Sequence, residues 1–391
     1  MRERLVTDVA IIGAGIVGAS AALALRRMGL TVSVLERDFC GSSASGVNYG
    51  GVRRQGRSLA QLPLAQRAHG IWGRLRDVIG IDGEYLRSGH LKVARSDPDL
   101  ASLEAYRERT RDFGLGLEII SGQALRLRWP WLGSRAVGGS WCPDDGHANP
   151  RLVAPAFAHT AQRLGANIRE QTRVDEVAHD GQCFVLRSGN EIEVHAPFLL
   201  NCAGAWAGAI AARFGENVPM VSAHPVMAVT EPLPLFMSLS LGVEGGGIYG
   251  RQISRGNCLI GGGRGYALDD ERAWPGRSAI LSVMEQAVEL LPALRRAHVI
   301  RTWSGTEGYL PDHEPVLGFS ATTPGLIHGF GFSGAGFQIG PAVGEVLAEL
   351  VRDGRSSTPA EAFSIARFTD PRRPHEDVAT HPLKGIEGAP P

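Results

Sequence analysis

The sequence predicts an α/β protein with two domains, one built on a parallel sheet and one on an antiparallel sheet. Three observations support this fold class. A strand–turn–helix–strand pattern occupies residues 8–37, and β-rich segments separated by turn signals run from Val218 to Gly263. In addition, a chain of 391 residues is longer than a single hydrophobic core usually serves.

A glycine-rich turn of the form GxGxxG follows the first apolar strand, Val9–Ile12. Gly13 permits a tight turn, Gly15 lets the backbone approach a pyrophosphate, and Gly18 lets the next helix pack on the strand. The N-terminus of that helix offers free N–H groups and a partial positive charge to phosphates. The turn therefore predicts a dinucleotide site.

The residues after this turn complete a dinucleotide-binding unit. Ser20–Met28 has the composition of a helix, Gly29 is placed to end it, and Val32–Leu35 is a second apolar strand. Glu36 closes this strand, where it can accept hydrogen bonds from a ribose. The alternative is a glycine-rich turn in a parallel sheet that binds no ligand.

Composition and charge exclude several classes of function. The chain has 43% hydrophobic and 20% charged residues, as ordinary globular proteins do. Its formal net charge is zero, so no global field attracts nucleic acid or an anionic membrane. Lysine occurs only at Lys92 and Lys384, neither in a convincing site, which disfavours a Schiff-base enzyme.

The cysteines and the apolar runs predict a cytoplasmic protein. No CxxC pair occurs among the five cysteines, so neither a zinc ribbon nor an iron–sulfur cluster is supported, and reduced thiols are expected. No signal peptide precedes the first strand, and no apolar run reaches the roughly 18 residues of a membrane span. We expect no metal, no membrane span and no nucleic-acid partner.

A small, polar, glycine-rich segment follows Glu36 and leaves the second strand at the ligand edge of such a sheet. Its polar side chains could bond phosphate or ribityl oxygens, and its glycines permit backbone close to a flat ring. These residues are Ser43, Ser45, Asn48, Gly50 and Gly51. The alternative is a flexible surface loop.

Two later glycine turns follow predicted strands and could reach the same edge. The strand Phe198–Asn201 leads to Ala203 and Gly204, whose backbone would lie beside the phosphates. Another strand begins at Leu326 and enters a glycine-dense turn at 331–336 that precedes a long helix. Both turns are candidates for further contacts to the same dinucleotide.

Three residues allow two interpretations. Arg53 and Arg54 are either solvated or face an acidic ligand. His147 lies in a predicted polar loop at 143–150 and is either catalytic or a structural, hydrogen-bonding histidine. The polar turn formers around His147 favour the structural role.

Five motifs are spread along the chain: the first glycine turn with Glu36, Ser45–Gly51, Asn201–Trp206, Trp303-Ser-Gly with Pro311–Gly318, and Gly331–Phe337. Together they resemble the FAD-dependent D-amino acid oxidase superfamily, over nearly the whole chain to about residue 352. Members of that superfamily include glycine oxidase, sarcosine oxidase, and the β subunits of heteromeric amino-acid and opine dehydrogenases.

The resemblance implies a two-domain flavoprotein, with FAD extended along a Rossmann-like sheet and an antiparallel sheet above the flavin ring. The FAD-binding domain is expected at 1–85, 145–215 and 320–368, the substrate domain at 86–144 and 216–319, and a tail at 369–391. Hydride is expected to move from the carbon bearing the amine to flavin N5, which leaves an imine that hydrolyses.

The motifs and the resemblance together give the candidate cofactor contacts. These are Gly13, Gly15, Ile16, Val17, Gly18, Glu36, Arg37, Ser43, Ser45, Asn48, Gly50, Gly51, Val174, Ala203, Gly204, Trp206, Gly305, Gly334, Ala335, Gly336, Phe337 and Gln338. No cysteine occupies the loop where monomeric sarcosine oxidases attach their flavin, so the resemblance implies non-covalent FAD. A second flavin, FMN, could lie at an interface with a partner subunit.

The candidate catalytic residues are Tyr249, Glu307 and Gly334. Tyr249 matches the tyrosine that touches substrate in glycine oxidase, or it is an ordinary aromatic residue on a sheet face. Glu307 and Gly334 stand where glycine oxidase-like members have arginines. This departure disfavours a simple glycine or D-alanine oxidase. An acid there suits a cationic group, such as the guanidinium of an arginine-derived opine, or pairs with a nearby arginine.

The Gly331–Phe337 and Gly250-Arg-Gln motifs look closest to the β subunits of heteromeric dehydrogenases, whose partner chains carry further redox centres. We therefore expect such a subunit to oxidise the C–N bond of a small amino-acid-like substrate. The alternatives are a stand-alone oxidase that uses O₂, an FAD-linked hydroxy-acid dehydrogenase, and an FAD-binding scaffold without catalysis. The motifs GxSxG, HExxH and GxxxxGK[ST] are absent from the sequence.

Overall fold

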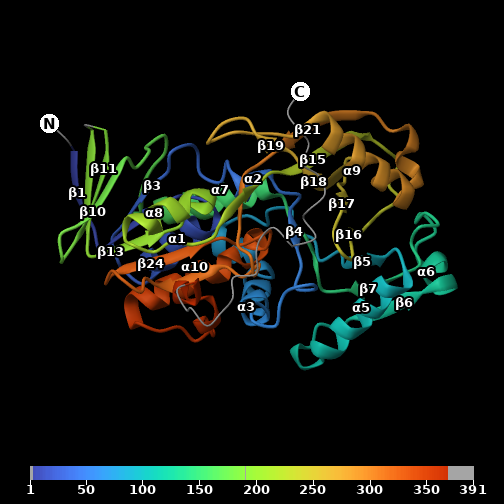
Figure 1. The fold of residues 1–391 in the computed structure, drawn as a ribbon, viewed down its shortest axis with the longest axis horizontal. Coiled ribbons are helices and arrows are strands. Elements are labelled where there is room, and N and C mark those ends of the chain that lie inside the picture. Colours follow the sequence, from blue (N-terminus) through green and yellow to red (C-terminus); the bar gives the residue numbers. More distant parts are fainter. Residues whose placement is uncertain (1–2, 190, 369–391) are drawn as a thin grey trace.

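A computed structural model describes residues 3–189 and 191–368, so the expected tail at 369–391 lies outside the described residues. Two large sheets lie toward opposite ends of the view in Figure 1. The first sheet has six strands. In spatial order they are β23 (Val316–Phe319), β24 (Leu326–Phe330), β13 (Phe198–Asn201), β2 (Val9–Ile12), β3 (Val32–Leu35) and β9 (Asn167–Arg169).

The strands of this sheet are apolar on both faces because both faces are covered. Side chains alternate along β2, so Val9 and Ile11 pack against helices while Ala10 and Ile12 pack against a smaller sheet. Strands β24, β13, β2, β3 and β9 run parallel, so their carboxyl ends meet at one edge of the sheet.

Helices cover one face of the six-stranded sheet. They are α1 (Ile16–Arg27), α3 (Leu62–Trp72), α4 (Leu75–Ile79), α7 (Pro150–Arg163) and α10 (Gly336–Asp353). Helix α1 is rich in alanine and packs closely on α10. A Cβ atom on Gly344 of α10 would lie only 2.5 Å from Cβ of Ser20, so this contact depends on the glycine.

A four-stranded sheet and helix α8 (Ala207–Arg213) lie against the other face. The strands, in spatial order, are β1 (Glu3–Val6), β12 (Ile192–Ala196), β11 (Phe184–Ser188) and β10 (Glu176–His179). The last three are antiparallel neighbours.

The second large sheet has eight strands and is antiparallel except at one pair. In spatial order they are β21 (Val299–Ser304), β15 (Pro225–Pro232), β18 (Asn257–Arg264), β17 (Ile248–Gln252), β16 (Ser240–Val243), β5 (His90–Ala94), β7 (Gly138–Cys142) and β6 (Glu118–Ser121). The exception is the parallel pair β16–β5, which joins segments far apart in the sequence. Helix α9 (Arg277–Leu290) packs on this sheet, and α5 (Asp97–Arg109) and α6 (Gly122–Arg128) lie near β5–β7 (Figure 1).

Shorter elements complete the described chain. They are α2 (Ala44–Val47), the pairs β4 (Gly51–Val52) with β8 (Gly146–His147), β14 (Val221–Ala223) with β22 (Glu307–Tyr309) and β19 (Tyr266–Ala267) with β20 (Ala273–Trp274), and 3₁₀ helices at Arg111–Phe113, Gly204–Trp206, Pro292–Arg296, Glu361–Phe363 and Ile365–Phe368. Among the residues with described positions, no helix combines the length and apolarity that crossing a membrane requires.

Two sequence expectations differ from the structure. Strand β23 pairs with β24 in the six-stranded sheet, although the expected domain boundary at 320 put residues 316–319 in the substrate domain. The predicted loop at 143–150 contains strand β8, which pairs with β4. Both differences arise from pairing with a distant segment, which local turn signals do not reveal.

Candidate active site

A cavity of about 1080 Å³ is lined by residues from the carboxyl edge of the six-stranded sheet, the loops after its strands, and the eight-stranded sheet. Ligand pockets usually enclose about 300–1,000 Å³, so this cavity has room for a large, extended ligand. Most predicted cofactor residues line it: Gly13, Gly15, Ile16, Val17, Glu36, Arg37, Ser43, Ser45, Asn48, Gly51, Val174, Ala203, Gly204, Trp206, Gly334, Gly336 and Phe337.

The first glycine turn has the close contacts that its sequence predicts. Gly13 has φ +96°, and a Cβ atom there would lie 2.5 Å from the carbonyl oxygen of Cys202. A Cβ atom on Gly15 would lie 3.0 Å from Oγ of Ser45 at the cavity wall. A side chain at Gly13 would collide with the backbone of Cys202, and one at Gly15 would press on Ser45, so the turn before α1 keeps its shape only with glycine at both positions.

Glu36 combines a structural and a binding role. Its Oε2 accepts a hydrogen bond from the N–H of Ala14 at 2.7 Å, and its Oε1 accepts one from the N–H of Asp38 at 2.9 Å. Burial raises the pKa of Glu36, and these N–H groups oppose that change. Each carboxylate oxygen keeps a further lone pair for a hydroxyl, so a ribose diol fits this end of the cavity.

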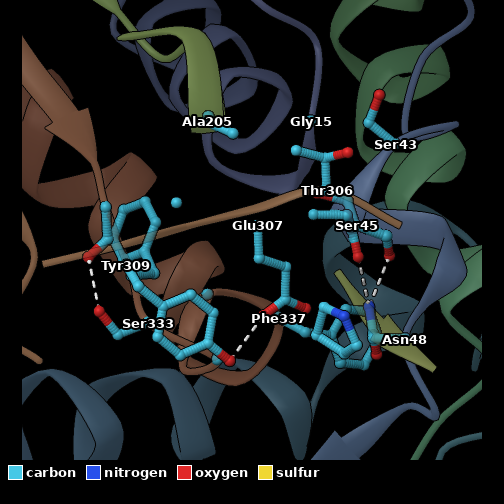
Figure 2. Close-up of a pocket in the computed structure, with 18 of the residues that line it drawn as sticks. Gly15, Ser43, Ser45, Asn48, Ala205, Thr306, Glu307, Tyr309, Ser333 and Phe337 are labelled. Carbon is cyan, nitrogen blue, oxygen red and sulfur yellow. Dashed lines mark hydrogen bonds between the residues drawn. The ribbon is translucent and has the colours of Figure 1, made fainter. Parts of the chain in front are cut away.

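The loop after β3 is held against α1 by its own polar groups (Figure 2). Oγ of Ser45 accepts a hydrogen bond from the N–H of Ile16 at 2.9 Å. The Asn48 amide donates to the carbonyl oxygens of Ala44 and Ser45, each at 3.0 Å, and its Oδ1 accepts from the N–H of Gly50. These bonds fix the backbone close to the ligand, in addition to any direct contact.

Five predicted cofactor residues do not line the cavity: Gly18, Gly50, Gly305, Ala335 and Gln338. The Gln338 amide donates to the carbonyl oxygen of Ala65 at 3.0 Å, so this side chain joins α10 to α3. A Cβ atom on Gly18 would overlap the carbonyl oxygen of Gly13. These residues therefore shape the walls, and sequence motifs do not distinguish that role from ligand contact.

The opposite wall carries a partly buried carboxylate beside two tyrosines. Glu307 and Tyr309 come from β22 and Tyr249 comes from β17, and all three line the cavity. Oη of Tyr309 donates to Oε2 of Glu307 at 3.2 Å (Figure 2). Burial raises the pKa of Glu307, while the Tyr309 hydrogen bond and the charge of Arg264 act in the opposite direction.

Backbone conformation and nearby side chains explain why position 334 is a glycine. Gly334 has φ +83°, which disfavours any side chain. A Cβ atom there would lie 3.3 Å from Oη of Tyr309 and 4.0 Å from Oε2 of Glu307. The two departures from glycine oxidase-like sequences therefore occur next to each other, and the acid occupies the region toward which an arginine would project.

Tyr249 and Tyr49 form a pair within the cavity, with ring centroids 4.7 Å apart. Burial is the main cause that raises the pKa of Tyr249, so its hydroxyl stays protonated at neutral pH. The backbone of Tyr49 is held by Arg251, whose Nε donates to the carbonyl oxygen of Tyr49 at 2.7 Å.

The structure distinguishes the roles of the three residues for which the sequence allowed two interpretations. His147 is buried, its Nδ1 lies 3.0 Å from Oγ of Ser88, and it does not line the cavity. Burial lowers the pKa of His147 to about 3, so it is a neutral, structural side chain. Arg54 pairs with Asp145, whereas Arg53 lines the cavity.

Sequence reasoning missed several cationic or polar residues in the cavity wall. They are Arg57, His90, Lys92, Arg95 and Arg264. Only the closeness of Arg57 to Arg53 in the loop was a signal available in the sequence, because the others come from strands of the second sheet or the segments beside them.

This fold, with a glycine turn and an acid at one end of a large cavity, is that of an oxidoreductase with a dinucleotide cofactor. The sequence profile described as FAD dependent oxidoreductase matches residues 8–350, and the chain belongs to this family. The expected superfamily, fold class and enzyme class are thereby confirmed.

The chain is 28% identical to glycine oxidase of Geobacillus kaustophilus (strain HTA426) over 376 residues, which cover 92% of this chain and 97% of that protein. It is also 28% identical to one of the subunits of the opine oxidase of Rhizobium meliloti, with the same two coverages. It matches 42% of the length of human mitochondrial sarcosine dehydrogenase, at 24% identity and 96% coverage of this chain.

The solved structure of L-proline dehydrogenase from P. horikoshii superposes with a TM-score of 0.86 at 27% identity, and the match covers 94% of this chain and 99% of that one. The protein is therefore an FAD-dependent amino acid or amine oxidoreductase. The turn at Gly15, the carboxylate of Glu36 and the length of the cavity fit FAD. When bound, FAD supplies the acceptor for a hydride and its two electrons.

Proposed function

We propose that this chain oxidises the C–N bond of an amino or imino acid and is the catalytic subunit of a heteromeric dehydrogenase. The observation that carries the first part is the partly buried carboxylate of Glu307, which faces the cavity beside Tyr249 and the turn before α10. An acid of this kind, with no bidentate arginine partner among the described residues, suits a cationic amine better than a substrate carboxylate.

The proposed chemistry assigns a proton to a named atom. A substrate ammonium binds the Glu307 carboxylate, which takes one proton from nitrogen and leaves a neutral amine. The C–H bond then breaks with loss of hydride, the C–N bond becomes an imine, and water hydrolyses the imine to a carbonyl compound and an amine. Tyr309 keeps the Glu307 carboxylate in place by donating to Oε2.

The surrounding residues support this chemistry by position. Tyr49 and Tyr249 form an aromatic wall that excludes water from part of the cavity. The first N–H groups of α10 have no partners within the helix, and Gly336 and Phe337 line the cavity there. Donors at a helix N-terminus stabilise negative charge that develops on a bound ring.

Similarity to opine oxidase subunits of two organisms supports the heteromeric part of the proposal. On this proposal, partner subunits accept the electrons and carry further redox centres. The competing assignment is a stand-alone oxidase, which similarity to glycine oxidase favours. The two assignments differ in the electron acceptor and share the chemistry at Glu307.

The proposal is tested by mixing FAD-loaded protein anaerobically with N-alkyl amino acids, primary amino acids and 2-hydroxy acids. We expect amines to remove the visible absorbance of oxidised flavin and hydroxy acids to leave it unchanged. Loss of absorbance with hydroxy acids alone would assign the alternative dehydrogenase. No loss with any compound, alone or with partner subunits, would assign a scaffold role.

A second measurement separates dehydrogenase from oxidase. Flavin reduced by the best amine is mixed either with air-saturated buffer or with an artificial one-electron dye. We expect rapid reoxidation by the dye and slow reoxidation by O₂. Rapid reoxidation by O₂ with stoichiometric hydrogen peroxide would replace the heteromeric dehydrogenase with a stand-alone oxidase.

A further inference from the structure

A group of cationic side chains lines the same cavity as Glu307. It consists of Arg53, Arg57, Lys92 and Arg95, and we call it the cationic cluster. The proposed chemistry at Glu307 does not use it. Buried His90 also lines the cavity here, and burial together with the charges of Arg53, Lys92 and Arg57 lowers its pKa.

The loop that carries Arg53 and Arg57 is held in place by a buried acid, Asp145. Asp145 is fully buried, and its two carboxylate oxygens accept hydrogen bonds from the N–H of Arg54 at 2.9 Å and of Gln55 at 3.0 Å. The Arg54 side chain pairs with the same carboxylate at 3.4 Å. One acid therefore fixes the backbone between the two arginines of the cavity wall.

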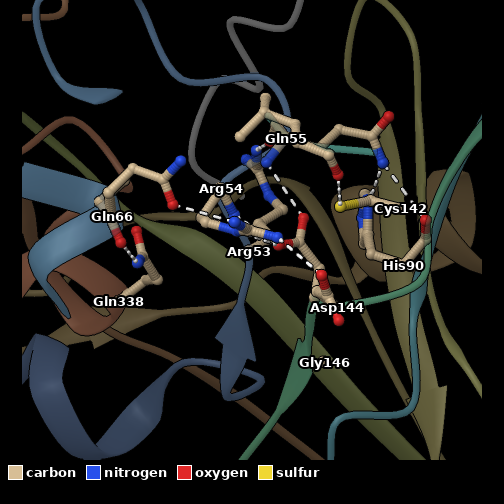
Figure 3. A network of polar contacts seen from close by, with 12 residues as sticks. Arg53, Arg54, Gln55, Gln66, His90, Cys142, Asp144, Gly146 and Gln338 are labelled. Atoms are coloured by element: carbon tan, nitrogen blue, oxygen red, sulfur yellow. Dashed lines mark hydrogen bonds and ion pairs between the residues drawn. The ribbon is translucent and has the colours of Figure 1, made fainter. Parts of the chain in front are cut away.

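A second contact ties this loop to the eight-stranded sheet. The Gln55 amide nitrogen lies 2.9 Å from Nδ1 of His90 and 3.2 Å from the carbonyl oxygen of His90, on β5 (Figure 3). Lys92 is two residues further along β5. A Cβ atom on Gly56 would lie 2.9 Å from Nη1 of Arg53 and 3.5 Å from Nζ of Lys92, so both cations approach the same glycine.

Arg57 has positive charge that its surroundings do not neutralise by direct contact. It is 7% exposed, and its Nε finds no hydrogen-bond partner within residues 3–189 and 191–368. Burial and the neighbouring Arg53 lower the pKa of Arg57 to about 9, so it stays cationic at neutral pH. Asp145 is already engaged by Arg54, and Glu244 pairs with Lys92.

The cluster and Glu307 are electrostatically separate. Arg264 is the cation that acts on Glu307, whereas the groups that act on Arg57 are Arg53, Asp145 and tyrosines that include Tyr49. Tyr249 is influenced by Glu307 and by Tyr49, and its ring lies against that of Tyr49 with the planes tilted by 40°. A molecule that contacts both Glu307 and the cluster must therefore extend along the cavity that both line.

We infer that the cationic cluster binds a carboxylate on a distal arm of the substrate, so that the preferred substrates are secondary amines with at least two carboxylates. This inference rests on the proposed oxidation of an amine at Glu307. Arg57 and Arg53 hold the distal carboxylate with charge-assisted hydrogen bonds, while Lys92 stays paired with Glu244 beside them. The free-energy cost of burying the charged Arg57 guanidinium is thereby offset when substrate binds.

The test uses two substrates that differ by one carboxylate, N-ethylglycine and N-(2-carboxyethyl)glycine. Anaerobic reduction of the FAD-loaded protein is followed by flavin absorbance, and we expect a second-order rate constant at least about tenfold higher for the diacid. In Arg57→Gln, the rate constant for the diacid should fall about 10- to 100-fold, toward that of the monoacid. Arg87→Gln, an exposed arginine outside the cavity, should keep the preference of the wild type.

A binding measurement separates this inference from the proposed function. Butyrate and its neutral amide butyramide, which cannot be oxidised here, are titrated into the FAD-loaded protein and followed by changes in the flavin spectrum or by calorimetry. Tighter binding of butyrate that Arg57→Gln abolishes supports the cluster, even if neither amine reduces the flavin and the proposed function fails. Equal binding of butyrate and butyramide overturns the inference and leaves the proposed function standing. Arg53→Gln gives the same comparison if Arg57→Gln does not fold.

Discussion

Individual residues in this cavity divide between holding the cofactor and acting on substrate. Glu36 accepts hydrogen bonds from the N–H groups of Ala14 and Asp38, and Glu307 is partly buried at the far wall with one tyrosine donor. Burial raises the pKa of both acids, yet only Glu307 lies beside the aromatic pair where an amine fits. Substitution of each acid should therefore affect a different measurement.

Glu307→Gln should slow flavin reduction by about 10²- to 10⁴-fold, because it removes the proposed proton acceptor. In the wild type, burial raises the pKa of Glu307, so the active carboxylate form is lost as pH falls through that raised value. The reduction rate should thus increase with pH through the raised pKa and then level off. In Glu307→Gln, this rise of the reduction rate with pH should be absent from the profile measured by anaerobic stopped-flow absorbance.

The variant Tyr309→Phe tests the role of Glu307 through the direction in which the pH profile shifts. The Tyr309 hydrogen bond lowers the pKa of Glu307, so its removal should move the same rise to higher pH while leaving a measurable rate. A shift to lower pH, or a rise that persists in Glu307→Gln, would contradict the role given to Glu307.

Glu36→Gln should weaken FAD binding by about 10- to 100-fold, because a neutral amide accepts weaker hydrogen bonds from a ribose. Equilibrium dialysis or quenching of free FAD fluorescence gives the dissociation constant. Once saturated with FAD, this variant should reduce at nearly the wild-type rate, since Glu36 lies away from the substrate end. Unchanged affinity would remove Glu36 from the cofactor site.

Elements in this fold approach closely only where glycine and alanine permit it. Helices α1 and α10 begin beside the cavity and pack against each other, so their spacing sets the positions of both N-termini. A Cβ atom added at Gly344 of α10 would lie 2.5 Å from Cβ of Ser20 and 2.6 Å from the backbone nitrogen of Ala21. Backbone atoms of α1 cannot move aside without shifting the whole helix.

Gly344→Ala should therefore destabilise the protein by about 1–3 kcal/mol through overpacking, despite the better helix propensity of alanine. Denaturant unfolding of the FAD-loaded protein gives the free energy. Gly70→Ala in α3 is a matched control, because a Cβ atom there meets no atom within 4 Å. That variant should be neutral or gain up to about 1 kcal/mol. Equal effects in both variants would argue against tight packing at Gly344.

At the scale of the whole molecule, some parts of the site could be predicted from the sequence and others could not. The first turn, Glu36 and the later glycine turns were predictable because each depends on a short segment with a fixed geometric requirement. Arg53 and Lys92 meet beside Gly56 only because the contacts of Asp145 and of Gln55 with His90 hold the loop against β5. No local pattern encodes that meeting, so the cationic cluster required the tertiary structure.

Residues of both large sheets line the cavity that fits FAD, so removal of the cofactor should affect the stability of the entire described fold. Cys202 lines the cavity, but it is 7% exposed and burial raises its pKa to about 12, so it remains an unreactive thiol. We therefore expect non-covalent FAD, which acid precipitation should release completely into the supernatant. Yellow colour that stays with the precipitate would indicate a covalent bond.

Re-addition of FAD to the apoprotein should then raise the midpoint of thermal unfolding in a concentration-dependent way. Free FAD at 100 times its dissociation constant stabilises the native state by about 2.7 kcal/mol, provided that the unfolded chain does not bind it. At one fixed FAD concentration, Glu36→Gln should show a smaller rise because its dissociation constant is larger. Glu307→Gln should show the wild-type rise, since its carboxylate lies at the substrate end. Equal rises in the wild type and Glu36→Gln would show that cofactor affinity resides elsewhere in the cavity.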